Sequence, residues 1–353
     1  MLRLTLQALK VAAIATVALL TLFFGQRLFD SYLERARTND TSPVLFTIAP
    51  DETNDAVAER LAELKLIRST TYFKGKIRLR GSESKLVAGP HTLRGGMSVD
   101  EILDTITATV STNPGTPGPA SYVQFRTQEG WRLEQIAQLM VDKGLARDKE
   151  QFYTALKDPS LARYDFLNGR PAGAGMEGFL FPDTYRVPQN VALKDAVALM
   201  LGDFDQRVPK NMRENLPEGF SFYQALTVAS IVEREAAIDS ERSIIASVYY
   251  NRLRGTPPLR LQADPTVQYA IGVESNWWPE LLPNDLPRQS PYNTYQHGGL
   301  PPGPICNPSL KSIQSALSPA QTDYLYFVAK GDGTHAFSRT YEEHQENVRK
   351  YQR

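Results

Sequence analysis

Cysteine and histidine are both scarce in this chain, which has one cysteine, Cys306, and four histidines among 353 residues. A single thiol cannot form an internal disulfide, which fits either a reducing compartment or an extracytoplasmic protein that avoids cysteine. The histidines are scattered and show no HExxH or similar ligand spacing. We therefore expect neither a zinc site nor a cofactor.

Net charge is also missing, because 39 basic residues balance 39 acidic ones. A chain without a net charge has no overall field to attract nucleic acid or an anionic membrane surface, so we expect no nucleic-acid partner. Internal repeats and low-complexity tracts are absent from the sequence as well. The length allows about two domains with appendages, enough for a sizeable core.

Charge is absent from one long stretch near the N-terminus, where residues 11–25 read VAAIATVALLTLFFG. This run is slightly shorter than the ~20 residues of a spanning helix, and its length overlaps that of a signal-peptide core. It ends in large residues without a small-x-small cleavage site, so we interpret it as an uncleaved transmembrane anchor. Arg3 and Lys10 place residues 1–10 in the cytoplasm by the positive-inside rule, although the arginines after the run weaken that inference. The rest of the chain then faces outward.

A polar stalk at residues 26–42 separates this anchor from a small domain at residues 43–110. The periodicity of that domain alternates between strand and helix, with a strand at 44–48, a helix at 56–66, a strand at 87–93 and a helix from Ser98 to Ile106. Such a unit has the size of a carbohydrate-binding module. A spacer domain explains the same pattern equally well.

A stretch rich in proline and glycine at residues 112–120 marks the next boundary. Beyond it, residues 111–353 are expected to form a larger mixed α+β domain. The patterns predict strands at 122–125, 323–328 and 335–337 and helices at 133–143, 192–208 and 341–351. The expected fold class of the whole chain is therefore α+β.

The most informative helix follows Ser221, which forms a capping box with Gln224 and precedes an apolar run from Ala225 to Val232. Two carboxylates, Glu233 and Glu235, interrupt that apolar surface. At about 100° per residue they point about 200° apart and cannot share one site. One of the two is then solvated or in a salt bridge, while the other lies inside the protein.

Glu235 is the better candidate for the buried position, because Ile231, Val232 and Ile238 lie one turn away. An apolar shell disfavours the charged carboxylate and raises its pKa, so that the protonated group can donate a proton to a leaving group. The alternative is that both glutamates are ordinary surface residues.

Six motifs, in order, carry a resemblance to a known family. They are EGWR at 129–132, FPDTY at 181–185, ASIVERE at 229–235, LQADPTV at 261–267, YNTY at 292–295 and GLPPG at 299–303. Together they resemble the YceG-like family from about residue 43 to the end of the chain. Its members are endolytic murein transglycosylases anchored in the bacterial inner membrane.

The resemblance implies a lytic transglycosylase that cleaves the MurNAc–GlcNAc bond of nascent glycan strands and leaves a 1,6-anhydro-MurNAc end. It implies a LysM-like subdomain at residues 43–110, a catalytic region on the periplasmic side, and peptidoglycan synthases as further partners. The family's catalytic glutamate falls on Glu235. Residues implied to bind substrate are Glu177, Asp183, Gln262, Asp264, Thr266, Tyr292, Asn293 and Tyr295, for each of which structural hydrogen bonding within loops is the alternative.

Two other functions compete with this one. A muramidase that uses water would need a second carboxylate, for which Asp264 and Glu177 are the candidates. A non-catalytic scaffold of the wall-synthesis machinery would use the same motifs only to shape a binding groove. An insert at residues 271–287 matches no family motif, and its Trp277–Trp278 pair suits a sugar platform, a membrane-surface contact or plain packing.

Overall fold

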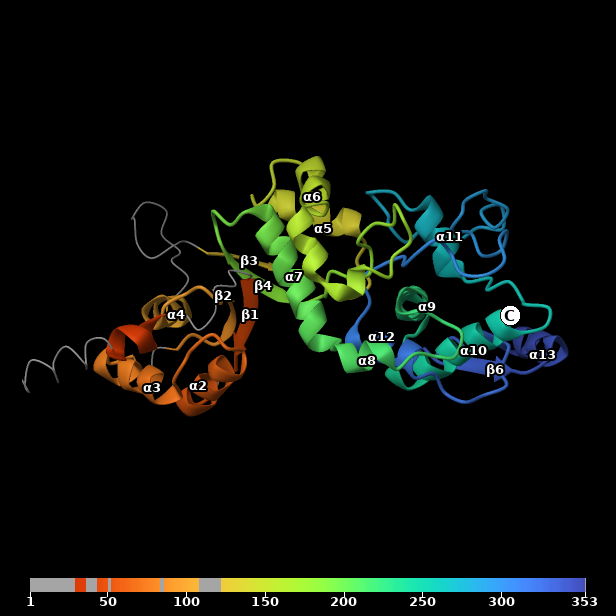
Figure 1. Ribbon diagram of the computed structural model, residues 1–353. Helices are drawn as coiled ribbons and strands as arrows, with labels where there is room; N and C mark the ends of the chain where they lie inside the picture. The colour runs from red at the N-terminus through yellow and green to blue at the C-terminus, as the bar shows by residue number, and fades with distance from the viewer. Residues whose placement is uncertain (1–28, 36–42, 50–51, 83–85, 108–121, 353) are drawn as a thin grey trace, which may run out of the picture. The chain divides into compact units, whose positions relative to one another are not determined.

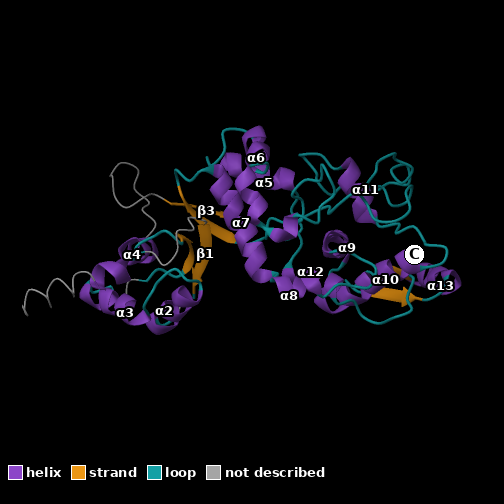
Figure 2. Cartoon of the chain, in the orientation of Figure 1, coloured by secondary structure: helices purple, strands orange, loops and turns teal. Residues whose placement is uncertain are grey.

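Helices dominate the protein, and the strands of its described part pair into three short two-stranded sheets (Figure 2). The predicted α+β class is therefore confirmed. The chain divides into two compact units, Met1–Tyr122 and Val123–Arg353. The computed structural model describes residues 29–35, 43–49, 52–82, 86–107 and 122–352.

The first unit is built on an antiparallel pair of strands, β1 (Pro43–Ile48) and β2 (Gly89–Arg94), with Pro43 opposite Arg94 and Ile48 opposite Gly89. Both strands match the sequence prediction closely. Helices α2 (Asn54–Glu63), α3 (Thr70–Leu79) and α4 (Val99–Thr107) belong to the same unit, and residues 29–34, within the predicted stalk, are also helical.

Helix α3 was missed by the sequence analysis. Its only buried side chains are Phe73 and Ile77, one helical turn apart, and Gly75 lies between them. Of its four apolar or aromatic residues, Leu79 is 86% exposed, so these positions do not define a single helical face along the sequence. Ser69 nevertheless starts the helix by accepting a hydrogen bond from the Tyr72 N–H, and both buried residues join the core of the unit.

The second unit begins with a sheet of two strands, β3 (Tyr122–Arg126) and β4 (Thr184–Pro188), which pair with each other. Between these strands lie α5 (Leu133–Asp142) and α6 (Lys149–Ala155), followed by two 3-10 helices at Pro159–Arg163 and Asp165–Leu167. Helices α7 (Leu193–Arg207) and α8 (Lys210–Glu214) come after the sheet. Helix α5 ends close to the predicted bound, and Gly144 follows it in a left-handed conformation with φ +66°.

The centre of this unit is α9 (Phe222–Glu235), which packs against α10 (Arg242–Arg254) and α12 (Leu310–Leu317) (Figure 1). A short 3-10 helix, Asp239–Glu241, leads into α10. The predicted capping box is present at the start of α9, where Ser221 and Gln224 exchange hydrogen bonds of 2.9 and 3.3 Å. Most side chains of α9 are buried, as its apolar composition indicated.

The remaining elements are α11 (Asp264–Ile271), the antiparallel hairpin of β5 (Tyr326–Ala329) and β6 (His335–Ser338), and the final helix α13 (Tyr341–Tyr351). The bounds of α13 are those predicted. Helix α13 packs on β5 and β6, yet none of its side chains is fully buried.

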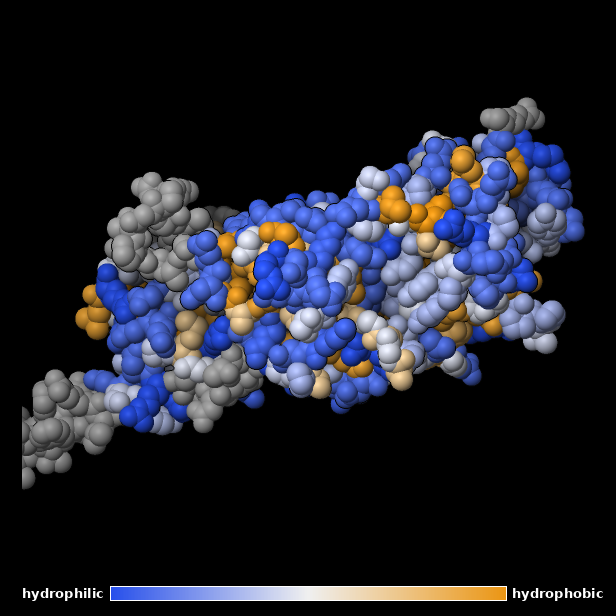
Figure 3. All heavy atoms as spheres, turned by 90° about the horizontal axis from the view of Figure 1, so that it is seen from above, coloured by the Kyte–Doolittle hydropathy of each residue, from blue (hydrophilic) through white to orange (hydrophobic). Residues whose placement is uncertain are grey.

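The predicted anchor at residues 11–25 and the boundary segment at residues 112–120 lie outside the described residues. Within the described ranges, no helix combines the length and the hydropathy needed to cross a bilayer. The face shown in Figure 3 is mostly hydrophilic, with hydrophobic side chains exposed in small separate areas.

Candidate active site

Glu235 is the last residue of α9, and its side chain lines a cavity of about 320 Å³. We call this space the Glu235 cavity. Helix α9 is embedded in the core, so its C-terminal end delivers the carboxyl to this cavity from a rigid support. The other lining residues are Tyr249, Arg252, Leu261, Gln262, Asp264, Tyr295, Tyr326, Phe327, Tyr341 and His344.

Burial raises the pKa of Glu235 to about 7, because the protein around it replaces most of the water that would solvate a carboxylate. The Tyr249 hydroxyl acts in the opposite direction, since it donates a 2.7 Å hydrogen bond to Glu235 Oε1 and favours the charged form. Asp264 adds a smaller contribution that raises the pKa again. The residue keeps some accessible surface, because the cavity is open to solvent.

The residues expected to form an apolar shell around Glu235 do not line the cavity. Ile231 and Val232 are buried in the core, and neither they nor Ile238 lines the cavity. The groups that surround the carboxyl are instead polar and aromatic side chains from α10, α11, the hairpin and α13. The cavity side of the carboxyl is therefore formed by residues brought there by tertiary packing.

Glu233 has a structural role on the other side of α9. Its Oε2 accepts hydrogen bonds from the Ser309 N–H (2.9 Å) and hydroxyl (2.6 Å), at the start of α12. Arg242 Nη1 lies 3.4 Å from the same oxygen. The side chain is only 7% exposed, so the alternative that both glutamates are surface residues is wrong, and the salt-bridged arrangement is the one observed.

Three of the eight expected substrate-binding residues share the cavity with Glu235: Gln262, Asp264 and Tyr295. The Tyr295 hydroxyl donates a 2.6 Å hydrogen bond to Asp264 Oδ1, which orients the carboxylate at the start of α11. Gln262 has φ +50°, a left-handed conformation that side chains other than glycine rarely adopt. Backbone strain of this kind persists only where the surroundings enforce it, and it clusters at functional sites.

Arg252 enforces this arrangement from α10. Its guanidinium donates hydrogen bonds to the carbonyls of Leu261 (2.8 Å) and Leu325 (2.6 Å) and to Gln262 Oε1 (3.3 Å). One side chain thereby ties the strained loop to the segment that leads into β5. The arginine itself is buried, so its position is well defined.

Thr266 and Asn293 do not face the cavity. The Thr266 hydroxyl bonds to the Ala263 carbonyl and to the Thr294 hydroxyl, at 2.7 and 2.9 Å. The Asn293 amide donates to the carbonyls of Leu286 and Arg288. Both side chains are fully buried, and they hold together the loops that present Gln262 and Tyr295.

Glu177 and Tyr292 line a different and larger space of about 450 Å³, which we call the Glu177 cavity. Burial raises the pKa of Glu177 to about 8. Its oxygens accept hydrogen bonds from the Leu133 N–H (3.1 Å) and the Asn307 amide (3.0 Å). The other lining residues include Tyr153, Tyr223, Tyr269 and the loop at 171–175.

The larger volume does not make the Glu177 cavity the better candidate for chemistry. Both carboxylate oxygens of Glu177 accept a hydrogen bond from the Leu133 N–H, whereas within the described part of the chain the Glu235 carboxyl accepts one from the Tyr249 hydroxyl alone. Asn307 also accepts hydrogen bonds from the Gly178 and Leu180 N–H groups. Glu177 and Asn307 therefore connect the segments at 131–133 and 178–180, and Glu235 has the carboxyl with fewer protein partners.

Asp183 lies apart from both cavities, beside β4. It accepts a hydrogen bond from the Thr184 N–H and pairs with Arg207 Nη2 at 2.9 Å. The described residues contain no cluster of three or more His, Cys, Asp or Glu side chains placed to hold a metal ion.

The Trp277–Trp278 pair packs on two arginines. The Arg132 guanidinium lies 5.0 Å from the Trp277 ring and 4.0 Å from the Tyr269 ring, and the Arg234 guanidinium lies 4.1 Å from the Trp278 ring. Cation–π contacts of this kind anchor the insert to the α9 and α5 region.

Seven residues that line the Glu235 cavity were not predicted from the sequence as site residues: Tyr249, Arg252, Leu261, Tyr326, Phe327, Tyr341 and His344. The nearest available signal was the SVYYNRLR segment, in which an arginine lies within a helix that is otherwise largely buried. A buried arginine needs several acceptors and often organises a site. Nothing local marks the residues of the hairpin or of α13.

Comparison with known proteins agrees with this architecture. The model of the YceG-like family matches residues 46–350, so the chain belongs to that family. A protein of Bacillus subtilis (strain 168) named endolytic murein transglycosylase is 35% identical over 332 residues, covering 91% of this chain and 88% of its own length. One of the same name from Streptococcus pneumoniae (strain D39) is 31% identical over 281 residues, and the match spans half of its length.

A solved structure supports the same assignment. The crystal structure of a YceG-like protein from Listeria monocytogenes aligns with a TM-score of 0.55 and 30% sequence identity. The alignment covers 87% of this chain and 99% of the other.

Proposed function

We propose that this protein is an endolytic lytic transglycosylase that cleaves the MurNAc–GlcNAc bonds of peptidoglycan glycan strands. Membership of the YceG-like family and the shared name of its relatives support this activity. The single observation that carries the mechanism is Glu235, a carboxyl with a pKa of about 7 that lines a cavity. Near neutral pH such a group exists in both protonation states and can exchange a proton in either direction.

In the first step, protonated Glu235 gives its proton to the glycosidic oxygen while the bond from that oxygen to C1 of MurNAc breaks. The GlcNAc side leaves as an alcohol, and C1 acquires oxocarbenium character. Asp264, held by Tyr295, and Gln262 line the same cavity and offer a negative charge and an amide dipole to this transition state.

In the second step, the C6 hydroxyl oxygen of the same MurNAc forms a bond to C1, and its proton passes to the Glu235 carboxylate. The product is a 1,6-anhydro end, the glutamic acid is regenerated, and no water is consumed. One carboxyl serves as acid and then as base, which explains how a site can work without the nucleophile of an ordinary glycosidase.

The residues expected to bind substrate differ in how close they lie to the bond that is cleaved. Gln262, Asp264 and Tyr295 contact the sugar at the cleavage point. Tyr292 and Glu177 contact a more distant part of the strand through the Glu177 cavity. Thr266, Asn293 and Asp183 position loops, since their hydrogen bonds are made within the protein.

The domain plan of the proposal extends beyond the catalytic unit. The first unit has a hydrophobic core of its own, which suits an independent LysM-like module that holds glycan. An N-terminal anchor would keep the enzyme on the periplasmic side of the inner membrane, next to synthases whose nascent strands it terminates. The proposed segments are 1–10 in the cytoplasm, 11–25 as anchor, 26–42 as stalk, 43–110 as LysM-like subdomain and 111–353 as catalytic domain.

The decisive experiment compares the full chain with its Glu235→Gln variant on purified glycan strands and measures product masses. We expect anhydro products from the wild type, with no added water, and a loss of at least a hundredfold in rate from the variant. Anhydro products formed by the variant at the wild-type rate would contradict the role of Glu235.

The same masses test the alternatives. Asp264 is the other carboxylate that lines the Glu235 cavity in the described structure, so a water-using muramidase would depend on it. If the wild type forms products heavier by one water and the Asp264→Asn variant does not, the protein is a water-using muramidase. Strand binding by the wild type without cleavage would favour a scaffold.

A further inference from the structure

Three aromatic rings gather on one wall of the Glu235 cavity. Tyr326 of β5 stacks on His344 of α13, with ring centroids 5.2 Å apart and an angle of 20° between the planes. Tyr341, at the start of α13, lies 5.8 Å from the Tyr326 ring and 6.2 Å from the His344 ring. All three residues line the cavity. We call them the aromatic wall.

The aromatic wall contributes little to the core. Helix α13 has no buried side chain, and the Tyr341 side chain remains 53% exposed. Polar contacts hold the helix, among them a 2.9 Å hydrogen bond from the Asn347 amide to the Ser338 hydroxyl. About half of the Tyr341 surface therefore stays open to solvent beside the cavity, where its ring is free to contact a bound ligand.

The His344 ring of the aromatic wall is favoured in its neutral form. Burial lowers the pKa of His344, and the nearby positive charge of Arg252 lowers it further. His344 Nδ1 is buried and has no hydrogen-bond partner among the described residues. The imidazole thus behaves as an aromatic ring and presents the same kind of surface as the two phenols.

We propose that Tyr326, Tyr341 and His344 form a sugar-stacking subsite for the pyranose ring next to the bond that is cleaved. The axial C–H groups of an N-acetylhexosamine give one face of its ring an apolar character, which matches an aromatic platform. The wall and Glu235 line one cavity, so a sugar on this platform lies within the same space as the reacting carboxyl. This inference rests on the function proposed above, because it assigns one subsite of that reaction.

The hairpin and α13 therefore form a substrate-binding element. Arg252 connects this element to the rest of the site, since its guanidinium lies 4.9 Å from the Tyr326 ring and also binds the loop of Gln262. One buried side chain thus links the wall to the loop of Gln262, while Asn251 of α10 also holds the segment before β5 through the Thr322 and Tyr324 carbonyls.

The test uses the full chain carrying Glu235→Gln, which is expected to bind strands with little cleavage, and purified uncross-linked glycan strands as the probe. Isothermal titration calorimetry measures the dissociation constant after Tyr341→Ala and after Tyr341→Phe. We expect about tenfold weaker binding for Tyr341→Ala, and a change of less than about twofold for Tyr341→Phe, which keeps the ring.

Tyr351→Ala provides the matched control, because this tyrosine lies on the same helix and does not line the cavity. It should bind strands as the parent does. An unchanged dissociation constant in Tyr341→Ala, or an equal loss in Tyr351→Ala, would overturn the subsite. Thermal unfolding of each variant identifies any that fails to fold. If Tyr341→Ala does not fold, the Tyr341→Phe variant tests the subsite, because a ring without its hydroxyl must still support strand binding.

Kinetics in the active protein separate this inference from the proposed function. Tyr341→Ala should raise KM about tenfold and leave kcat within a few-fold, since Glu235 is intact. Absence of any strand cleavage by the wild type would refute the proposed function itself. Cleavage with unchanged KM in Tyr341→Ala would refute only the aromatic wall.

Discussion

The Tyr249 hydroxyl donates a 2.7 Å hydrogen bond to Glu235 Oε1 and so joins the middle of α10 to the last residue of α9. Burial raises the pKa of the carboxyl, and this hydrogen bond opposes the rise. The balance leaves the pKa at about 7, where one group can serve as acid and base in turn.

Tyr249→Phe removes the opposing contribution and should raise the pKa of Glu235 further. Since the reaction begins with the protonated acid, the alkaline limb of the pH–rate profile should move upward by about one pH unit. The kcat measured on glycan strands between pH 5 and 9 gives this shift directly. A limb that moves to lower pH would contradict the assignment.

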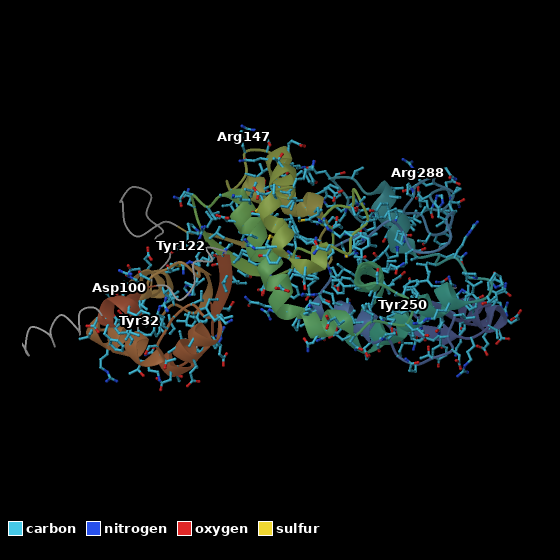
Figure 4. All side chains as sticks on the ribbon, in the orientation of Figure 1. Tyr32, Asp100, Tyr122, Arg147, Tyr250 and Arg288 are labelled. Carbon is cyan, nitrogen blue, oxygen red and sulfur yellow. The ribbon has the colours of Figure 1, made fainter. Side chains whose placement is uncertain are left out.

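Tyr250→Phe is the control for this variant. Tyr250 is the next residue of α10 and is labelled in Figure 4; its hydroxyl donates a 2.8 Å hydrogen bond to the Ala316 carbonyl. Its loss should cost about 1 kcal/mol of stability and leave the pH–rate profile in place.

Glu233→Gln separates the two glutamates of α9. The charge of Glu233 supports the start of α12 through Ser309 and pairs with Arg242. Removing that charge should destabilise the protein by about 1–3 kcal/mol, because charged hydrogen bonds in a buried site are replaced by neutral ones. Denaturant unfolding measures the loss, while kcat per folded molecule should stay within a few-fold of the wild type.

Two substitutions of Gln262 separate the role of its side-chain amide from the strain of its left-handed backbone. Both Gln262→Ala and Gln262→Gly remove the amide from the cavity, so both should lower kcat on the order of tenfold or more. Only glycine relieves the strain of φ +50°, and the Gly variant should therefore be more stable than the Ala variant by about 1 kcal/mol. Chemical denaturation of the two proteins gives the difference.

Lys65 supplies the comparison, since it is exposed in the first unit and has φ +57°. Its Ala and Gly variants should differ in stability in the same sense and by a similar amount. Neither Lys65 variant should reduce kcat. If the Lys65 variants lose as much activity as the Gln262 variants, the Gln262 result does not show a role in catalysis.

Glu177 makes stability depend on pH. Its pKa is about 8 in the folded protein and near 4.5 in the unfolded chain, so the folded state favours the proton. The stability that it contributes is present below pH 4.5 and is lost as the pH rises through 8. Relative to Glu177→Gln, the wild type should lose several degrees of Tm between pH 5 and pH 8. For a domain of this size, each kcal/mol of lost stability lowers Tm by about 2–4 °C. A difference in Tm that does not change with pH would contradict this.

Much of the fold could be predicted where local interactions decide it. The start of α9 depends on a hydrogen-bond exchange between Ser221 and Gln224, and α13 has the bounds that its polar and aromatic pattern indicates. Helix α3 could not be predicted, because only Phe73 and Ile77 mark its buried face.

The site divides in the same way. Helical geometry alone separates Glu233 from Glu235, and the motif series singles out Gln262, Asp264 and Tyr295, which the structure brings to the same cavity. Tyr292 and Glu177 belong to another cavity, and no pattern along the chain distinguishes a tyrosine of one from a tyrosine of the other.

By itself, the amino-acid sequence determined the carboxyl that ends a buried helix, because capping and helical period act between residues at most four positions apart. Only the tertiary structure decided how acidic that carboxyl is and what lies around it. Tyr249, Arg252 and the rings of α13 reach Glu235 through packing. A pKa depends on every group within a few ångströms, whatever its distance along the chain.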